Sequence, residues 1–394
     1  MTKEQYALIN RNTFKTLPDR AAQDYPREPK RLYVEPTSYC NLSCEMCFRK
    51  SWINEHFGNI QLDAVLRVMD EPIFESVETV FFGGMGEPLI HPYIFEMIAA
   101  ARERGKKVEL ITNGTSLRGD VPEKLVRLGV STVWVSIDSF ESGNYEKIQV
   151  GSSFGTVVKN MQLFNEARRG TDTKLGLTFV LMKSNILQLK DFERFTEFIG
   201  ADEVNISNMI PNTPDMEPET LAYQTISEDY IHPHYYDKAK TLVAMFRMTE
   251  DDLAENRGIE PLLDRYRALL WKGEPLLRKE NSCKFITGGQ CFIRWDGEVM
   301  PCMGLLHSAH TCLHGTVRTV MSHSFGNIYK SSFAEIWNSA AYTHFRERVA
   351  AFNFAPCTTC GGCERREGTA DDCISSDGPV CGACLWGQGV ARCP

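Results

Sequence analysis

Apolar residues in the first half of the chain fall into short β-rich runs that alternate with segments of helical spacing. The β-rich runs lie at 32–35, 77–82, 107–112, 132–137, 175–181 and 203–207. Each of the first five precedes a segment with helical spacing, at 62–69, 94–104, 122–128, 154–168 and 186–199. Strands that alternate with helices predict an α/β fold of right-handed βαβ units around a parallel sheet. Six strands would make an incomplete (β/α)6 TIM-like barrel, although an open, doubly wound sheet fits the pattern as well.

Three other regions flank this alternation. Residues 1–30 carry several charges and two prolines and are interpreted as an N-terminal arm before the partial barrel of residues 31–210. Prolines and scattered acids, followed by helical spacing over 236–278, indicate a linker and helical connection over 211–280. Residues 281–394 are rich in cysteine and glycine and predict a small second domain.

The composition is that of an ordinary globular protein of 394 residues, 43% hydrophobic and 24% charged. The chain has no run of about eighteen apolar residues and no secretory signal, so we expect a cytoplasmic protein with no membrane partner. Its net charge is −8 and it has no long basic tract, so nucleic acid is not an expected partner either.

The placement of the fourteen cysteines narrows the chemistry. Three stand close together near the start of the chain, and the other eleven all follow residue 280. In a reducing compartment disulfides are rare, and clustered thiols are more often metal ligands.

The first cysteine cluster follows the first predicted strand. Cys40, Cys44 and Cys47 have CxxxCxxC spacing, and the next candidate ligand along the chain is His56. A loop at the carboxyl end of a strand is where α/β proteins place their chemistry. A structural zinc site uses four ligands, whereas three thiolates suit a [4Fe–4S] cluster with one open iron. Three unpaired buried thiols, or a zinc site completed by a distant ligand, are the alternatives.

A glycine-rich segment follows the second predicted strand. It contains Gly83 and Gly84 and ends in Glu87 and Pro88. Glycine lets the backbone approach a ligand closely, and a carboxylate can accept hydrogen bonds from an ammonium group. A simple turn from strand to helix is the alternative.

Polar residues also end the later strands. Asn113 and Thr115 follow the third strand, where an Asn-Gly turn alone would explain them. Period-two alternation places Ser136 and Asp138 on one face of the fourth strand, where they suit a ribose or a helix N-cap. Three weaker candidates lie near the sixth strand: Asn205, Ser207 and Asn208.

The C-terminal cysteines form two blocks. The first contains Cys283, then Cys291 and Cys302, which an Asp-Gly turn would join in a hairpin. The second block consists of Cys357, Cys360, Cys363, Cys373, Cys381, Cys384 and Cys393. Their CxxC steps are typical of metal sites, and the spacing fits zinc and iron–sulfur clusters equally.

Four residues near these blocks are not expected to be metal ligands. We expect Cys312 to be a packed thiol. We expect His307, His310 and His314 to be loop or core residues.

Together the first cysteine cluster and the strand ends resemble radical S-adenosylmethionine (SAM) enzymes. The resemblance implies that the open iron chelates SAM and that one electron cleaves it to a 5′-deoxyadenosyl radical, which abstracts hydrogen from the substrate. Six residues would contact the cofactor: Gly83, Gly84, Glu87, Asn113, Ser136 and Asp138. No catalytic side chain is assigned beyond the cluster. Met46 replaces a usually aromatic residue, and Met85-Gly86 is an insertion in the family's GGEP element.

The C-terminal cysteines resemble the SPASM extension of these enzymes, which holds auxiliary [4Fe–4S] clusters. The resemblance implies one cluster on Cys283, Cys291, Cys302 and Cys373. It implies a second on Cys357, Cys360, Cys363 and one of Cys381, Cys384 or Cys393. The CxxCxxC step departs from the usual CxxCxxxxxC, so this partition stays open.

Further segments are similar to a radical maturase subfamily encoded beside tungsten-containing aldehyde oxidoreductases. They include 47–52, 295–307, 324–328 and 384–390. The likeness implies a protein or cofactor substrate, with the tungsten enzyme as a possible partner and ferredoxin or flavodoxin as electron donor. One rival hypothesis is a maturase that crosslinks peptides, against which the short arm counts. The other is a zinc-stabilised interaction protein without catalysis.

Overall fold

The structure, a computed structural model, describes residues 23–220, 282–313, 315–355, 364–374 and 376–388, with Cys357 and Ala391. It also describes four short strands, β7 (Ala222–Gln224), β8 (Ala244–Phe246), β9 (Leu270–Trp271) and β10 (Glu274–Pro275). Most of the predicted N-terminal arm lies outside the described residues, and so do His314, Cys360, Cys363 and Cys393.

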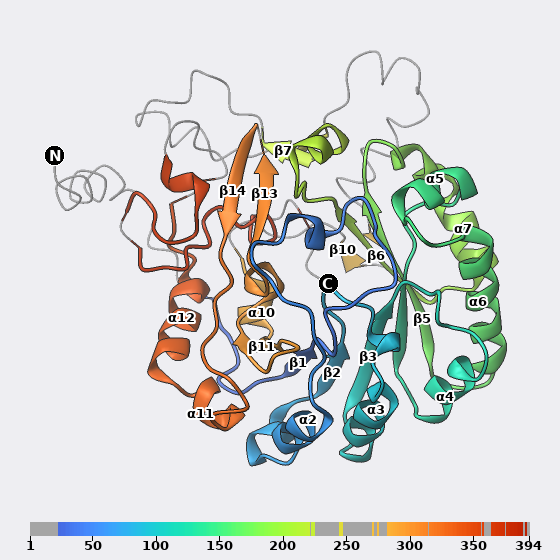
Figure 1. The fold of residues 1–394 in the computed structure, drawn as a ribbon, viewed down its shortest axis with the longest axis horizontal. Helices are drawn as coiled ribbons and strands as arrows, with labels where there is room; N and C mark the ends of the chain where they lie inside the picture. The colour runs from blue at the N-terminus through green and yellow to red at the C-terminus, as the bar shows by residue number, and fades with distance from the viewer. Residues whose placement is uncertain are drawn as a thin grey trace.

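An eight-stranded sheet forms the centre of the molecule, with the strand order β12-β11-β1-β2-β3-β4-β5-β6 (Figure 1). Its first six strands are β1 (Arg31–Val34), β2 (Thr79–Phe82), β3 (Lys107–Thr112), β4 (Thr132–Ser136), β5 (Lys174–Leu181) and β6 (Glu203–Asn208). All six run parallel, so their carboxyl ends meet at one edge of the sheet. The predicted six-stranded partial barrel is confirmed.

Helices cover the outer face of these strands, as Figure 1 shows. They are α2 (Leu62–Met69), α3 (Ile94–Glu103), α4 (Val121–Arg127), α5 (Ser142–Ile148), α6 (Phe154–Ala167) and α7 (Phe192–Ile199). Short 3-10 helices precede or connect them: η1 (Phe48–Ser51), η2 (Pro72–Ser76), η3 (Pro88–Ile90), η4 (Ile186–Asp191) and η5 (Pro214–Glu219). The predicted helix at 186–199 is thus η4 followed by α7, and α5 was not predicted.

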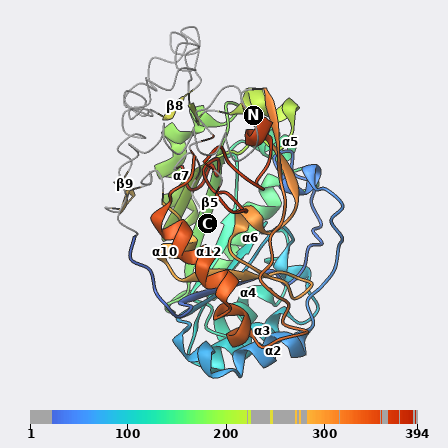
Figure 2. The ribbon, with the colours of Figure 1, turned by 90° about the vertical axis from the view of Figure 1, so that its left-hand side faces the viewer.

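The C-terminal unit continues the sheet beyond β1, with α10 and α12 toward the viewer in Figure 2. Its helices are α10 (Lys284–Thr287), η8 (Met303–Leu305), α11 (Phe333–Trp337), α12 (Ala340–Ala351) and η9 (Glu364–Glu367). Its strands are β11 (Gln290–Ile293), β12 (Val299–Met300), β13 (Ala309–Leu313) and β14 (Thr316–Val320).

The predicted hairpin around the Asp-Gly turn is β11–β12, and it joins the main sheet instead of forming a separate one. β11 pairs with β1 in parallel, and Leu32 lies opposite Cys291. A free edge at β1 would leave a row of backbone groups without partners, and β11 covers it. The proposed boundary between the barrel and the second domain is therefore crossed by a continuous sheet.

The sequence between these units agrees less well with expectation. Most of the predicted helical segment 236–278 lies outside the described residues. Where the structure describes it, at β8, β9 and β10, the chain forms short strands and not the expected helix. Helical spacing alone does not distinguish a helix from apolar residues that pack in other ways.

Period-two alternation of the strands separates two parts of the core. Leu32 and Val80 face the helices, whereas Tyr33 and Phe81 face the interior of the partial barrel. There the Tyr33 ring packs against Phe81 at 4.8 Å and against Phe292 of β11 at 4.7 Å. Aromatic rings from the C-terminal unit therefore fill part of the barrel interior. Within the described residues, no helix is both long and apolar enough to cross a membrane.

A buried network of charged side chains joins the two units. Glu35 follows β1 and is fully buried, and its carboxylate lies 2.9 Å from Nε2 of His307. Nδ1 of His307 lies 2.8 Å from Glu55, and the ring stacks on Trp52 at 4.3 Å. Burial lowers the pKa of His307, but Glu35 and Glu55 outweigh it and raise the pKa to about 9. His307 is a core histidine, as predicted, and at neutral pH it is charged.

We expect this network to make stability depend on pH. The folded pKa of His307, about 9, exceeds its ordinary value of 6.5. The stabilisation is therefore complete below pH 6.5 and is lost as the pH rises through 9, on the order of 3 kcal/mol. His307→Gln should flatten the dependence of the urea midpoint on pH over this window, measured under anaerobic conditions. An unchanged slope would contradict the assignment.

Candidate active site

The loop after β1 carries the first three cysteines over the carboxyl end of the sheet. Cys40, Cys44 and Cys47 are half-buried free thiols. The loop is fixed to the end of α5, because the Ser43 amide donates to the Val150 carbonyl at 3.0 Å. The three thiols thus lie at the edge where all parallel strands end.

Two side chains hold this loop in place from within the site. Asn212, which follows β6 and is buried, donates through Nδ2 to the carbonyls of Met46 at 3.2 Å and Cys47 at 2.6 Å. Arg49 donates to the carbonyl of Leu42 at 2.6 Å. Sequence reasoning missed Asn212. In the sequence alone, a single asparagine after a strand looks the same whether its side chain is exposed to solvent or holds a neighbouring loop.

The electrostatic surroundings of the thiols fit a metal cluster. Burial raises the pKa of Cys40 and Cys44, and Asp138 and the neighbouring thiol of Cys47 raise that of Cys44 further. Thiols in such surroundings need a cation before they ionise. No three His, Cys, Asp or Glu side chains in the described part of the chain converge on the position of a single metal ion. A cluster distributes its ligands over several metal atoms and does not require that convergence.

The glycine-rich segment after β2 packs directly on the start of the cysteine loop. A Cβ on Gly86 would lie 2.0 Å from the carbonyl oxygen of Thr37, and one on Gly84 would lie 2.6 Å from Glu35. The Met85 amide donates to Glu35 at 2.9 Å. The inserted Met85-Gly86 therefore brings two backbone segments into contact, which explains why glycine is needed there.

Glu87 closes the same segment and is already held by the protein. It is buried, and burial raises its pKa to about 7. Its carboxylate accepts hydrogen bonds from Leu89 N at 3.1 Å, Thr112 Oγ1 at 2.8 Å and Asn113 N at 2.7 Å. Glu87 thus fastens the end of β2 to the end of β3. Gly83, which precedes it, packs against Ile111 with no room for a side chain.

Asn113 connects the end of β3 to the cysteine loop. Its Nδ2 donates to Asn41 Oδ1 at 2.9 Å and lies 3.8 Å from Cys40 Sγ. Its Oδ1 accepts from Thr115 Oγ1 at 2.6 Å. The expectation that these polar groups could reach the cysteine loop agrees with this geometry.

Ser136 and Asp138 lie on one side of the end of β4, as the alternation predicted. Asp138 is fully buried, and burial raises its pKa to about 6. It accepts hydrogen bonds from Val180 N at 2.8 Å and from Gln149 Nε2 at 2.8 Å, with Ser136 Oγ at 3.4 Å. Asp138 therefore anchors β5 and the end of α5, a structural role that the sequence did not indicate.

Three buried amide oxygens near this edge have no hydrogen-bond partner among the described residues. They belong to Gln149 at the end of α5, Asn205 on β6 and Asn212. Asn205 was a sequence candidate, and the other two were not. Buried acceptors without donors are rare in native proteins. A bound molecule with hydroxyl or ammonium donors would satisfy them, so these acceptors fit a polar cofactor beside the cysteine loop.

The C-terminal cysteines that the structure describes gather beside the barrel. Cys291 lies on β11 and is buried, and Cys302 follows β12. Cys302, Cys381 and Cys384 line one cavity. Cys312 is buried on β13, where its thiol donates to Glu217 at 3.2 Å, and it is a packed thiol as expected.

Known families match both parts of the chain. A family model described as the Radical SAM superfamily matches residues 34–195, and one described as SPASM, an iron–sulfur cluster-binding domain, matches residues 283–364. A tungsten-containing aldehyde ferredoxin oxidoreductase cofactor-modifying protein from Pyrococcus furiosus is 30% identical, covering 93% of this chain and 97% of that protein. The chain belongs to the radical SAM superfamily. Its radical SAM domain binds SAM and a [4Fe–4S] cluster, and its SPASM domain binds auxiliary iron–sulfur clusters, which replaces the zinc interpretation.

Other similar proteins share the fold more distantly. An AdoMet-dependent heme synthase from Nitratidesulfovibrio vulgaris is 22% identical, covering 92% of this radical SAM chain and 94% of the synthase. The crystal structure of Streptococcus suis SuiB bound to S-adenosylmethionine has a TM-score of 0.54 at 17% identity, covering 91% of this chain and 74% of SuiB. Native anSMEcpe with bound AdoMet has a TM-score of 0.53 at 18% identity, covering 89% and 93%. These structures support the fold.

Removing the amide of Asn212 should loosen the cysteine loop. Asn212→Ala would leave two loop carbonyls without their donor, at a cost of about 1–3 kcal/mol for each buried group. We expect a lower urea midpoint and less iron retained after gel filtration. Asn144→Ala is the control, since that amide donates to an exposed carbonyl away from the loop. Equal iron retention in both variants would contradict the role of Asn212.

A methyl group at Gly86 should displace the cysteine loop. Gly86→Ala places a carbon against the Thr37 carbonyl, a backbone atom that cannot move without the loop. We expect weaker SAM binding by equilibrium dialysis and loss of iron from the first cluster. Gly143→Ala is the matched control, because its Cβ meets no atom within 4 Å. SAM binding as tight as in the unmodified protein would refute the packing argument.

Proposed function

We propose that this radical SAM enzyme modifies the cofactor of a tungsten-containing aldehyde ferredoxin oxidoreductase. The observation that carries the proposal is the likeness over 97% of the Pyrococcus furiosus protein, which is named for modifying that cofactor. A match over 93% of this chain is long enough to span the cysteine loop and the first block of C-terminal cysteines together. We also propose the domain limits 31–210 for the partial barrel, 211–280 for the connection and 281–394 for the SPASM-type unit.

In this proposal Cys40, Cys44 and Cys47 hold the cluster that binds SAM. When bound, the cluster and SAM together supply a one-electron cleavage that yields a hydrogen-abstracting carbon radical. The chain's own groups hold the site in shape: Gly83, Gly84, Glu87, Asn113, Ser136 and Asp138 frame the cofactor, with Gln149 and Asn212 as additions. Glu87 already accepts three hydrogen bonds, which leaves its carboxylate about one further site for the cofactor's ammonium group.

The auxiliary clusters would lie on Cys283, Cys291 and Cys302 and on the second cysteine block. We propose that the enzyme takes its electrons from a ferredoxin or flavodoxin in the cytoplasm. No role for nucleic acid or membrane is proposed.

A peptide substrate is the second candidate. A PqqA peptide cyclase from Granulibacter bethesdensis is 25% identical, covering 53% of this chain and 61% of that protein. That likeness covers about half of the chain, so it favours a peptide less than the first relative favours a cofactor.

The test is an anaerobic reaction with SAM, dithionite and either the isolated tungsten–pterin cofactor or the aldehyde oxidoreductase before maturation. We expect 5′-deoxyadenosine above the substrate-free level and a mass change in the cofactor. Cys44→Ala should abolish both, because it removes one of three cluster thiolates, while the auxiliary clusters remain. Cleavage of SAM by Cys44→Ala would overturn the assignment of the cysteine loop. Reaction only with a peptide would replace the proposed substrate.

A further inference from the structure

Two arginines in the C-terminal unit are removed from solvent, one fully and one in part, and have no acidic partner among the residues that the structure describes. Arg346 on α12 is 4% exposed, and Arg318 on β14 is half-buried. Among the described residues, the groups that act on their charges are phenols, thiols and another arginine, and none is a carboxylate. Charged side chains away from water are normally paired with an opposite charge. The structure therefore leaves two positive charges to be explained.

Arg346 stacks on aromatic rings and makes one side-chain hydrogen bond among the described residues. Its guanidinium lies 4.1 Å from the centre of the Trp337 ring and 4.5 Å from that of Tyr342. Nη2 donates to Thr343 Oγ1 at 3.2 Å, whereas Nε and Nη1 are buried with no partner. Nε and Nη1 can therefore donate hydrogen bonds to an acceptor that the described residues do not supply.

Tyr342 adds a third unused donor at the same place. The residue is fully buried, and its hydroxyl has no partner. After burial itself, the group that raises its pKa most is Cys291, and Cys302 and Cys283 act in the same direction. Tyr342 and Cys291 belong to one buried cluster, against which Cys283 and Cys302 pack, and α10, which follows Cys283, contacts α12. The Tyr342 hydroxyl, which has no partner among the described residues, therefore lies in the same packed core as the first C-terminal block, and Arg346 stacks on its ring.

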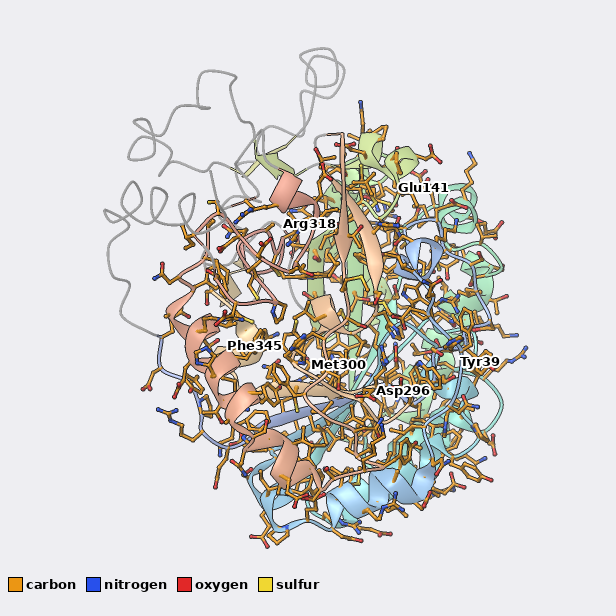
Figure 3. All side chains as sticks on the ribbon, turned by 60° about the vertical axis from the view of Figure 1, so that its left-hand side comes forward. Tyr39, Glu141, Asp296, Met300, Arg318 and Phe345 are labelled. Carbon is orange, nitrogen blue, oxygen red and sulfur yellow. The ribbon has the colours of Figure 1, made fainter. Side chains whose placement is uncertain are left out.

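Arg318 has a comparable position beside the second block. Its guanidinium donates to the carbonyls of Gly368 and Ala383, at 2.9 to 3.3 Å. The charges that act on it are those of the cysteines Cys384, Cys357 and Cys381. Figure 3 shows Arg318 on the β13–β14 hairpin of the C-terminal unit.

Arg318 also shares a cavity with thiols of both blocks. The cavity is lined by Arg318, Cys302, Cys381 and Cys384, among others. Cys384 Sγ accepts a hydrogen bond from the Gly387 amide at 3.4 Å. The two groups of cysteines are therefore adjacent, and each has its own arginine.

The chemistry of the expected clusters explains this arrangement. A cluster bound by four thiolates is an anion, and its negative charge grows by one on reduction. A nearby cation and hydrogen-bond donors stabilise the reduced form more, and so raise the reduction potential. Neutral thiols would give the arginines no such partner.

We propose that Arg346 and Arg318 are counter-ions of two different auxiliary clusters. Arg346, with the Tyr342 hydroxyl, serves the cluster on Cys283, Cys291 and Cys302. Arg318 serves the cluster of the second cysteine block, in which Cys384 is the ligand nearest to it. Both arginines are positioning residues that raise the potentials of their clusters. The inference rests on the auxiliary clusters and not on the identity of the substrate.

The test is a redox titration of each auxiliary cluster by EPR in the reconstituted full-length protein. Cys302→Ala and Cys384→Ala assign the two signals, since each removes a ligand of one cluster. In Arg346→Gln we expect the equilibrium constant for reduction of the Cys302 cluster to fall at least tenfold, a shift of about 59 mV for one electron. Arg318→Gln should shift the Cys384 cluster equally. Arg346→Lys and Arg318→Lys, which keep the charge, should restore most of each shift.

The matched control is Arg127→Gln, which removes an exposed arginine of α4 and should shift neither potential. If a Gln variant loses iron and the Lys variant at the same position retains it, that result would also support a role for the charge. Unchanged potentials with full iron content would overturn the proposal. Iron loss in both the Gln and the Lys variant at one position would also overturn the proposal, because the geometry of the arginine side chain and not its charge would then hold the cluster. A shift of the same cluster by both arginines would refute the division into two sites. SAM cleavage and substrate modification are measured separately, so a failure of the proposed function can be distinguished from a failure of the counter-ion proposal.

Discussion

The parallel pairing of β11 with β1 is the interaction on which the rest of the structure depends. β1 leads into the loop of Cys40, and β11 leads through the hairpin to Cys302. β12 turns back antiparallel to β11, so Cys302 does not share the edge of the Cys40 loop, but the ladder of hydrogen bonds between β1 and β11 fixes Cys291 and its hairpin relative to that loop. The buried contact between the side chains of Glu35 and His307 connects the same two units. The radical SAM domain and the auxiliary unit are therefore built on one sheet.

Much of the fold could be predicted from the chain itself, since alternation between period two and helical spacing is local information. The six parallel strands and five of the helical segments were predicted this way. The position of β11 could not be, because pairing between residues 31 and 290 leaves no trace in either segment. The helix α5 was missed because its seven residues include few apolar positions. Spacing over 236–278 was misleading where short strands were found.

The candidate site was predictable at its cysteines and less so around them. Spacing identifies thiols that share a loop, so Cys40, Cys44 and Cys47 could be recognised without the fold. Glu87 and Asp138 were proposed as cofactor contacts, and the structure shows that both also hold neighbouring strand ends together. Side chains that act by holding the loop or by charge, such as Asn212 and Arg346, become visible only when their buried partners are known. The carboxyl edge of the parallel strands is therefore held in one geometry by the protein's own hydrogen bonds, and this fixed geometry is the physical basis of the site.

The central claim is that one chain holds three clusters around this shared sheet. The most direct measurement is iron, sulfide and zinc per chain in anaerobically reconstituted protein, together with EPR of the reduced sample. We expect about twelve irons, four for each of three cubane clusters, with little zinc and three overlapping reduced-cluster signals. About four irons with zinc would contradict the auxiliary clusters, and zinc alone would contradict the radical chemistry as well.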